Sequence, residues 1–389
     1  MGLFFQTIGS SLKLLPAAVW DELHIFLTSF HKIKWPTNIA LQLLLFWQIY
    51  MIFISLANGY GQSITFLRYG LVFVGLVLLK NYYRSLLIAF SKNFFFMIGL
   101  MYFGISIGLY IFGIALGLPV AWWQETLWVG TAYSAFVIYI IIAIILMNSF
   151  SINQRLIFLG LGFVSGVLMD SRLVFVLLFT LLPFIFSGDK KSNLKKSLFS
   201  SIRSFLIFVF IISSLSSVLI NYNKEINSVF KSTQATILDL TSETNSTDRD
   251  ADRRDNIRAV ASLMNDDPFT FIFGSGLTSH QYELSEYLDN SADNKVRPSG
   301  VPAVVFDGGI IYLLLIFICA CNSILQFISY YLNNLISFRT LSILALVITN
   351  SFIVLFITNT TDLMLWWAVI LSGQILNKEL IHEFNNRFA

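Results

Sequence analysis

Charge is the scarcest property of this chain. Only 12% of its 389 residues are Asp, Glu, Lys or Arg and 56% are hydrophobic, whereas a soluble domain carries ~25% charged residues. This composition excludes a soluble globular protein and predicts an all-α, polytopic membrane protein. The 38 Phe and 8 Trp residues fit lipid-facing helices and interfacial aromatic belts.

Several catalytic motifs are also missing from the sequence. The absence of a Walker A sequence argues against an ATP-driven pump, and there is no Gly-x-Ser-x-Gly elbow of a serine hydrolase. Without His-Glu-x-x-His, Cys-x-x-Cys or a His cluster, no metal and no cofactor are expected. Acids spaced as Asp-x-Asp at 248–252 are typical of metal-dependent glycosyltransferases, but a solvated charge cluster is the simpler interpretation. Cys319 and Cys321 lie in an apolar stretch and are expected to be buried thiols.

The hydropathy pattern predicts about ten transmembrane helices. Residues 1–37 are too polar to span a membrane and are expected to form an interfacial segment. The transmembrane regions are 38–221 and 300–377, with a large extracytoplasmic loop at 222–299 between them and a tail at 378–389. The predicted spans are 38–57, 64–80, 93–115, 125–147, 156–169, 173–187, 199–221, 300–326, 338–357 and 363–377.

Basic residues predict the orientation of these spans. Lys80, Arg84 and Arg155 fall in alternate loops, and the short loops near 58–63, 116–124 and 358–362 contain no Lys or Arg. By the positive-inside rule, both termini are cytoplasmic. The 222–299 loop then lies on the outer face. Arg203 and Arg339, near inner ends of spans, are expected to snorkel towards the membrane surface.

A polar triplet, Asp170-Ser171-Arg172, interrupts the apolar run from Leu156 to Phe186. The run is too long for one span and short for two, so it predicts two short helices that meet at a polar hinge. An ionised group at membrane depth costs at least ~2.5–3.5 kcal/mol and is usually functional. Arg172 is therefore a candidate site residue, and the orientation places it on the outer side with the loop.

The 222–299 loop contains two amphipathic segments that are expected to form short helices. Ile257, Val260, Ala261 and Met264 fall on one face of a predicted helix that ends at 266–268. A second amphipathic piece follows at 281–288, so the loop is expected to fold back on the membrane domain.

Arg254 and Arg258 are one helical turn apart, a spacing that suits binding of one anion. Gly274 and Gly276 permit tight turns and close approach of the backbone to a ligand. Simpler interpretations are a solvated charge cluster, an ordinary turn and, for His280, a surface residue.

The region at 156–315 resembles the O-antigen polymerase and ligase superfamily of membrane glycan enzymes. Four features carry the resemblance. They are the Ser171-Arg172 step between short spans, the large outer loop, the order Arg254–helix–Pro268–Gly274-Ser275-Gly276, and the Gly308-Gly309 pair in the following span. The family usually has a His just before that span, but this chain reads Arg297-Pro298-Ser299-Gly300 there, which favours a polymerase over a ligase.

The resemblance implies an enzyme of the bacterial inner membrane, with its active site on the outer face. A polymerase of this kind transfers a growing glycan from polyprenyl pyrophosphate to another lipid-linked repeat unit, without a metal and with inversion. Its donor and acceptor are both lipid-linked oligosaccharides, a chain-length regulator is a possible partner, and no nucleic acid is involved. The alternatives are a ligase that transfers the glycan to lipid A core or protein, a lipid-glycan flippase, and a structural membrane scaffold.

The resemblance also implies roles for particular residues. Arg172 and Arg254 would hold the pyrophosphate, with Arg258 in support, because Arg forks bind phosphate oxygens bidentately. The general base is left open among His280, Asp307 and Glu283, with His280 taken as the catalytic candidate. The remaining candidates for substrate binding are Arg253, Gly274, Gly276, Arg297 and Asp307.

Overall fold

The fold was analysed in a computed structural model. It describes residues 36, 38–60, 72–73, 75, 92–115, 131–148, 150–168, 172–185, 260–281, 300–357 and 364–375. Throughout these ranges the regular structure is helical and there are no strands. The described part of the chain is therefore all-α, as the composition predicts.

The helices follow the predicted apolar segments closely. In chain order they are α3 (Ile39–Ala57), α5 (Lys92–Ala115), α7 (Thr131–Met147), α8 (Ile152–Leu168), α9 (Arg172–Leu181), η3 (Leu182–Phe184), α13 (Pro268–Phe273), η4 (Ser279–Gln281), α15 (Gly300–Leu332), α16 (Phe338–Ile357), α17 (Met364–Ile370) and α18 (Ser372–Ile375). The predicted spans at 64–80 and 199–221 lie largely or wholly outside the described residues, so the count of ten stays a prediction.

Three of the described helices are long and apolar enough to cross a membrane. They are Ile39–Ala57, Gly300–Leu332 and Phe338–Phe356, and shorter apolar helices occupy Phe96–Gly108, Ser134–Met147 and Leu173–Phe184. This supports a membrane protein by length and composition.

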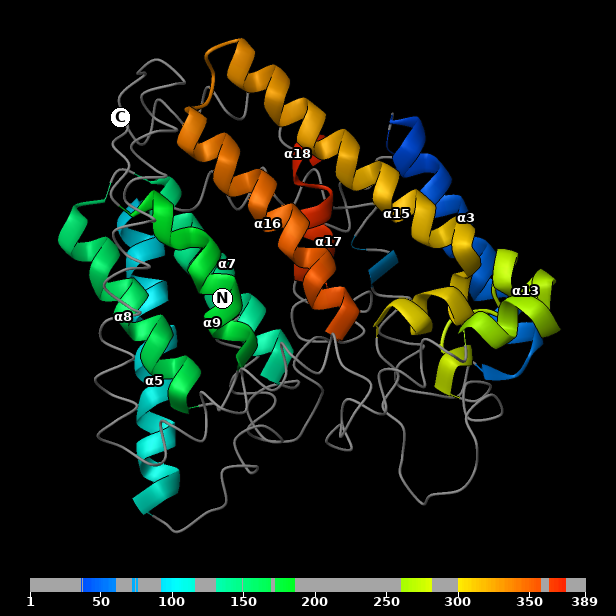
Figure 1. Ribbon diagram of the computed structural model, residues 1–389, viewed down its shortest axis with the longest axis horizontal. Helices are drawn as coiled ribbons and strands as arrows, with labels where there is room; N and C mark the ends of the chain where they lie inside the picture. Colours follow the sequence, from blue (N-terminus) through cyan, green and yellow to red (C-terminus); the bar gives the residue numbers. More distant parts are fainter. Residues whose placement is uncertain are drawn as a thin grey trace.

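The helices form two groups that share one hydrophobic core. Helices α5, α7, α8 and α9 pack together, while α15 packs against α3, α13, α16, α17 and α18 (Figure 1). Contacts between α16 and α7 join the two groups. The core contains large, fully buried side chains from both groups, such as Phe136, Phe158, Tyr312, Trp366 and Trp367.

Helices α8 and α9 form a close pair, as the interrupted apolar run predicts. Gly162 and Gly166 on α8 let α9 approach, since a Cβ at Gly166 would lie 2.9 Å from Val174 Cγ1. Small residues at membrane helix contacts permit this close packing. Helix α8 ends at Leu168 and α9 begins at Arg172, so the polar triplet falls at the junction.

Two buried arginines mark one end of the bundle. Arg155 donates to the Ile185 carbonyl at 3.2 Å and to the Asn148 carbonyl at 3.4 Å, and Arg339 donates to the Asn148 carbonyl at 3.3 Å. These bonds satisfy carbonyls at the ends of α7 and η3. The expectation that Arg339 snorkels is therefore wrong, because the residue is only 2% exposed.

The opposite end of the bundle is called the loop end, and both α9 and α15 begin there. Arg339 at the start of α16 lies at the arginine end, and a short turn at 333–337 links it to the last turn of α15, so α15 begins at the loop end. Arg155 bonds Ile185 just after η3, so α9 begins at Arg172 at the loop end as well. The side of a membrane that this end faces stays a prediction.

The loop helix at 260–266 buries only part of the predicted face. Ala261 and Met264 are exposed, and Leu263 is buried against Val305 and Phe306 of α15. The prediction holds at Val260, which packs against this cluster, and is wrong at Ala261 and Met264, because the helix packs through Leu263 instead. Ile257 lies outside the described residues. The helix does end where predicted, and Asp267 then caps α13 by accepting from the Thr270 amide at 3.1 Å.

Candidate functional site

Residues 274–281, here called the docking segment, hold the loop against α15. The Ser275 amide donates to the Phe306 carbonyl and the Gly276 amide to the Asp307 carbonyl, both at 2.9 Å. Two backbone stretches that lie far apart in sequence are thus paired directly. The pairing places the docking segment at the loop end of the bundle, beside the first part of α15.

A break in α15 makes this pairing possible. Gly309 adopts φ 71° and ψ 177°, which interrupts the helix, and Figure 1 shows the first part of α15 turned away from its long second part. Carbonyls just before a helix break lose their partners within the helix. Ser275, Gly276 and the Trp47 indole take their place, the last by donating to the Gly308 carbonyl at 2.7 Å.

The two loop glycines permit close contact between backbones. Gly274 has φ 77° and Gly276 has φ 104°, a region that favours glycine. A Cβ on Gly276 would lie 2.6 Å from the Ser55 amide nitrogen, and one on Gly274 would meet the Asp307 carbonyl. These glycines bring α3, the docking segment and α15 together, and their contact with a substrate stays a prediction.

The end of α3 holds the other side of the docking segment. Asn58 Nδ2 donates to the Ser275 carbonyl at 3.0 Å, and Ser55 Oγ donates to the Leu277 carbonyl. Thr278 has φ 72°, which a β-branched residue rarely adopts, and such strain costs about 1–3 kcal/mol. The surrounding hydrogen bonds therefore impose a strained backbone two residues before His280.

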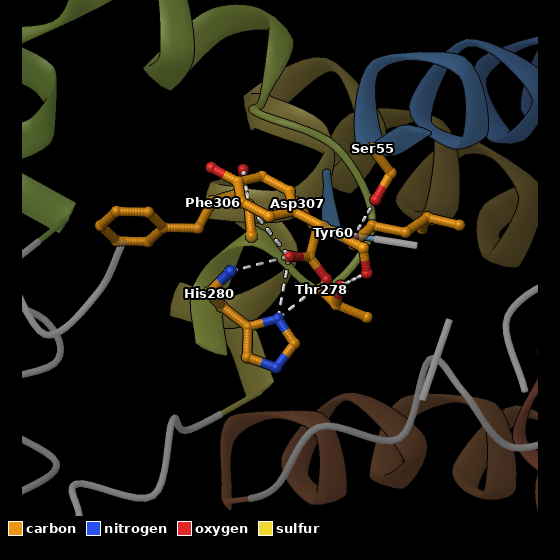
Figure 2. Close-up of polar contacts among 8 residues, drawn as sticks. Ser55, Tyr60, Thr278, His280, Phe306 and Asp307 are labelled. Carbon is orange, nitrogen blue, oxygen red and sulfur yellow. Dashed lines mark hydrogen bonds and ion pairs between the residues drawn. The ribbon is translucent and has the colours of Figure 1, made fainter. Parts of the chain in front are cut away.

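The contact between α3, the docking segment and the first part of α15 is here called the docking junction. His280 and Asp307 form a buried pair at its centre (Figure 2). His280 Nδ1 lies 2.8 Å from Asp307 Oδ1 and 2.9 Å from Oδ2. The two residues are 4% and 2% exposed, respectively. His280 is thus buried, and the interpretation of it as a surface residue is wrong.

Three donors converge on the Asp307 carboxylate. Besides His280 Nδ1, Oδ1 accepts from the His280 amide and from the Ser279 hydroxyl, each at 3.1 Å. Ser279 shares its single hydrogen between this oxygen and the Phe306 carbonyl, which lies at 2.9 Å. A carboxylate only accepts hydrogen bonds, so it assigns the imidazole hydrogen to Nδ1. In the neutral imidazole Nε2 keeps its lone pair, and Figure 2 shows that this nitrogen points away from Asp307. The arrangement is that of a general base with an orienting carboxylate.

Four of the predicted site residues meet in this junction, namely Gly274, Gly276, His280 and Asp307. Arg172 begins α9 at the same end of the bundle, although its side chain lies outside the described part of the chain. Arg253, Arg254, Arg258 and Arg297 lie outside the described residues, as does Glu283. The arginine clamp therefore stays a prediction.

Sequence reasoning missed three residues that build the junction: Trp47, Ser55 and Ser279. Each bonds to a backbone carbonyl of a distant segment, at Gly308, Leu277 and Phe306, respectively. No local pattern in the sequence reports such contacts. In the described ranges, no group of three or more His, Cys, Asp or Glu side chains is placed to hold a metal ion.

Comparison of the chain with protein-family models, with curated proteins and with solved structures finds no match.

Proposed function

We propose that the chain is a membrane glycan polymerase that uses His280 as its general base. The observation that carries this proposal is the buried His280–Asp307 pair, in which Asp307 contacts one imidazole nitrogen and the other points away from it. The pair lies where an extended loop docks on a broken apolar helix, at the bundle end where α9 begins with Arg172. A lipid-linked substrate has its reactive groups next to a membrane surface, which suits a site at the end of a bundle.

The chemistry is a glycosyl transfer between two lipid-linked glycans. The acceptor hydroxyl loses its proton to His280 Nε2 while its oxygen attacks the anomeric carbon of the donor. The bond from that carbon to the pyrophosphate oxygen breaks, and polyprenyl pyrophosphate leaves with the electron pair. Attack opposite the leaving group inverts the anomeric centre. Asp307 stabilises the protonated imidazole that forms.

The leaving group needs positive charge to balance the charge that develops on it. Arg172 and Arg254 are proposed to hold the pyrophosphate, with Arg258 in support, because planar guanidinium groups pair with phosphate oxygens and keep their charge in a partly desolvated site. Arg253 and Arg297 add to the basic surface along the substrate. In this proposal the loop end of the bundle faces the outer side of a bacterial inner membrane.

A cell-based experiment separates this function from its rivals. Loss of a polymerase leaves single repeat units attached to their final acceptor, whereas loss of a ligase leaves long polymer on its lipid carrier. Loss of a flippase leaves lipid-linked repeats on the cytoplasmic side. A strain that lacks the chain is expected to show single capped repeats. Long lipid-linked polymer in that strain would favour the ligase.

Arg172 provides a sharper variant in the same strain. Arg172→Ala is expected to abolish long polymer at normal protein level, and Arg172→Lys is expected to restore only part of it, because Lys keeps the charge but lacks the bidentate fork. Unchanged glycan length in Arg172→Ala would exclude the pyrophosphate role.

A further inference from the structure

The short helix α13 exposes an apolar face beside a membrane-spanning helix. Its sequence, Pro268 to Phe273, contains no charged residue. Phe269 is 66% exposed and Ile272 is also exposed, while Thr270 is buried against the rest of the protein. The helix therefore has one face packed on α15 and another covered by none of the described residues.

Aromatic contacts connect this face to the exposed surface of α3. Phe269 lies 4.8 Å from Phe273 between ring centroids, and Phe273 stacks on Trp47 at 6.2 Å with an interplanar angle of 19°. Trp47 in turn lies 5.1 Å from Tyr50. A continuous row of rings thus runs from α3 to the exposed Phe269.

The surface that this row joins has the pattern of a lipid-facing stripe. Five large apolar side chains of α3 are exposed at helical spacing, and Phe46 beside Trp47 is 69% exposed. The exposed residues are Ile39, Leu43, Phe46, Phe53 and Leu56. Because α3 is long and apolar enough to cross a membrane, this stripe is expected to face acyl chains.

The position of α13 along α3 sets its depth in a membrane. A Cβ on Gly309 would meet the Phe273 amide nitrogen, and one on Gly308 would meet Met51 Sδ, so the backbone of Phe273 lies near the level of Met51. Met51 lies about 9 Å from the end of α3 at Ala57 at a rise of about 1.5 Å per residue. A hydrocarbon core is about 30 Å thick, so a span centred in it puts Phe273 roughly 9 Å below the surface. The six residues of α13 extend only about 9 Å, which keeps Phe269 close to the same apolar layer.

We propose that α13 is inserted in the outer part of the bilayer, with Phe269 and Ile272 in contact with lipid acyl chains. The carboxylates of Asp266 and Asp267, which precede the helix, stay in the headgroup layer. An apolar face that enters the boundary of headgroups and acyl chains by ~5–10 Å is the usual depth of an interfacial helix. The docking segment begins directly after Phe273, so lipid contact fixes the position of His280 relative to the membrane. This inference does not depend on the proposed glycosyl transfer.

Site-directed fluorescence in lipid nanodiscs tests the insertion. An environment-sensitive nitrobenzoxadiazole label is placed on Phe269→Cys, with Asn265→Cys on the preceding loop helix as the matched exposed control, after both native cysteines are changed to Ala. At position 269 we expect blue-shifted emission that brominated lipids quench and iodide does not. At position 265 we expect iodide to quench more strongly than brominated lipids.

The other outcomes overturn the proposal. Iodide quenching at 269 equal to that at 265 means that α13 faces water. Blue-shifted emission without brominated-lipid quenching means that protein, such as a second copy of the chain, covers the face. Benzoylphenylalanine at position 269 of the otherwise unchanged chain gives an independent check. Lipid adducts after illumination support insertion, whereas only crosslinked protein, or no adduct, contradicts it.

Discussion

Asp307→Asn is the substitution that most sharply separates chemistry from packing at the junction. Asn has nearly the same shape as Asp, so the fit between α15 and the docking segment is retained. Its amide group, however, presents hydrogens where the carboxylate presents only lone pairs. An amide NH₂ that faces His280 Nδ1 needs that nitrogen to accept, which moves the ring hydrogen to Nε2. The proposed base then has no lone pair available for the acceptor hydroxyl.

The expected magnitude follows from the contacts. A positioned general base contributes about 10²- to 10⁴-fold to the rate, or roughly 3–5 kcal/mol of barrier at about 1.36 kcal/mol per tenfold. The cost in stability is smaller, about 1–3 kcal/mol, because an Asn carbonyl can still accept from Ser279 and from the His280 amide. We therefore expect a loss of rate larger than the loss of folding free energy explains.

The assay compares three purified variants in nanodiscs for polymerisation rate and thermal unfolding. Asp307→Asn and His280→Gln are expected to lose rate by about 10²-fold or more. Ser323→Ala is the matched control, because Ser323 also lies on α15 and its buried hydroxyl donates to the Ile370 carbonyl at 2.7 Å, away from the docking segment. It is expected to lose about 1 kcal/mol of stability with its rate unchanged.

The comparison of rate with stability decides between the two roles of the pair. If Asp307→Asn and His280→Gln keep the wild-type rate, the pair only holds the loop in place and the assignment of His280 as base is wrong.

Three further predictions concern the supporting structure. Gly309→Ala is expected to lower the unfolding temperature, because a left-handed φ costs about 1–2 kcal/mol for a residue with a Cβ and that Cβ meets the Ile272 carbonyl; an unchanged unfolding temperature contradicts the break in α15. Hydrogen bonds from Thr270 lower the pKa of Asp267. The stabilisation of α13 by the ionised Asp267 side chain is therefore fully present above the ordinary Asp pKa and is lost as the pH falls through the lowered value. In the wild type, hydrogen exchange of the α13 amides, corrected for intrinsic rates, is therefore expected to become faster on acidification. In Asp267→Ala the exchange is expected to be faster than in the wild type at neutral pH and to depend less on pH. Identical protection in the two proteins rules out the cap. Arg339→Met removes a hydrogen-bond donor from the carbonyls at the end of α7, so the free energy of unfolding is expected to fall by about 1–3 kcal/mol. If Arg339 instead snorkelled to the membrane surface, the same substitution would leave the unfolding temperature almost unchanged.

Most of the described helices were predictable because burial in lipid imposes a simple rule on sequence. A helix in hydrocarbon satisfies its own backbone, so long apolar runs between polar residues give both its presence and its bounds. The spans predicted at 38–57 and 338–357 match α3 and α16 within one residue. The junction between α8 and α9 was predictable for the same reason, since Asp170-Ser171-Arg172 interrupts an apolar run.

The end of α15 was less predictable. The helix continues to Leu332, beyond the predicted span end at 326. Its break at Gly309 depends on contacts from elsewhere in the chain, namely the backbone of Ile272 and the indole of Trp47. Gly308-Gly309 marks a place where a break is possible, but the pair alone does not determine whether the break occurs.

The candidate site was only partly predictable. His280 and Asp307 each stood among the candidates, yet they are 27 positions apart and no periodicity joins them. Their meeting depends on the docking segment pairing with carbonyls that the helix break releases. Arg155 and Arg339 illustrate the same limit. Their positions predicted a common end of the bundle, but not that both side chains would be buried on the Asn148 carbonyl.

Reconstituted polymerisation tests the central claim most directly. The purified full chain in nanodiscs is incubated with lipid-linked repeat units isolated from cells that lack it, and both the glycan ladder and the free polyprenyl pyrophosphate are measured. We expect the wild type to make a ladder with one pyrophosphate carrier released per new linkage, and His280→Gln to lose both signals while remaining folded. A folded wild-type protein that makes no ladder, or a His280→Gln variant that makes the wild-type ladder, would contradict the account.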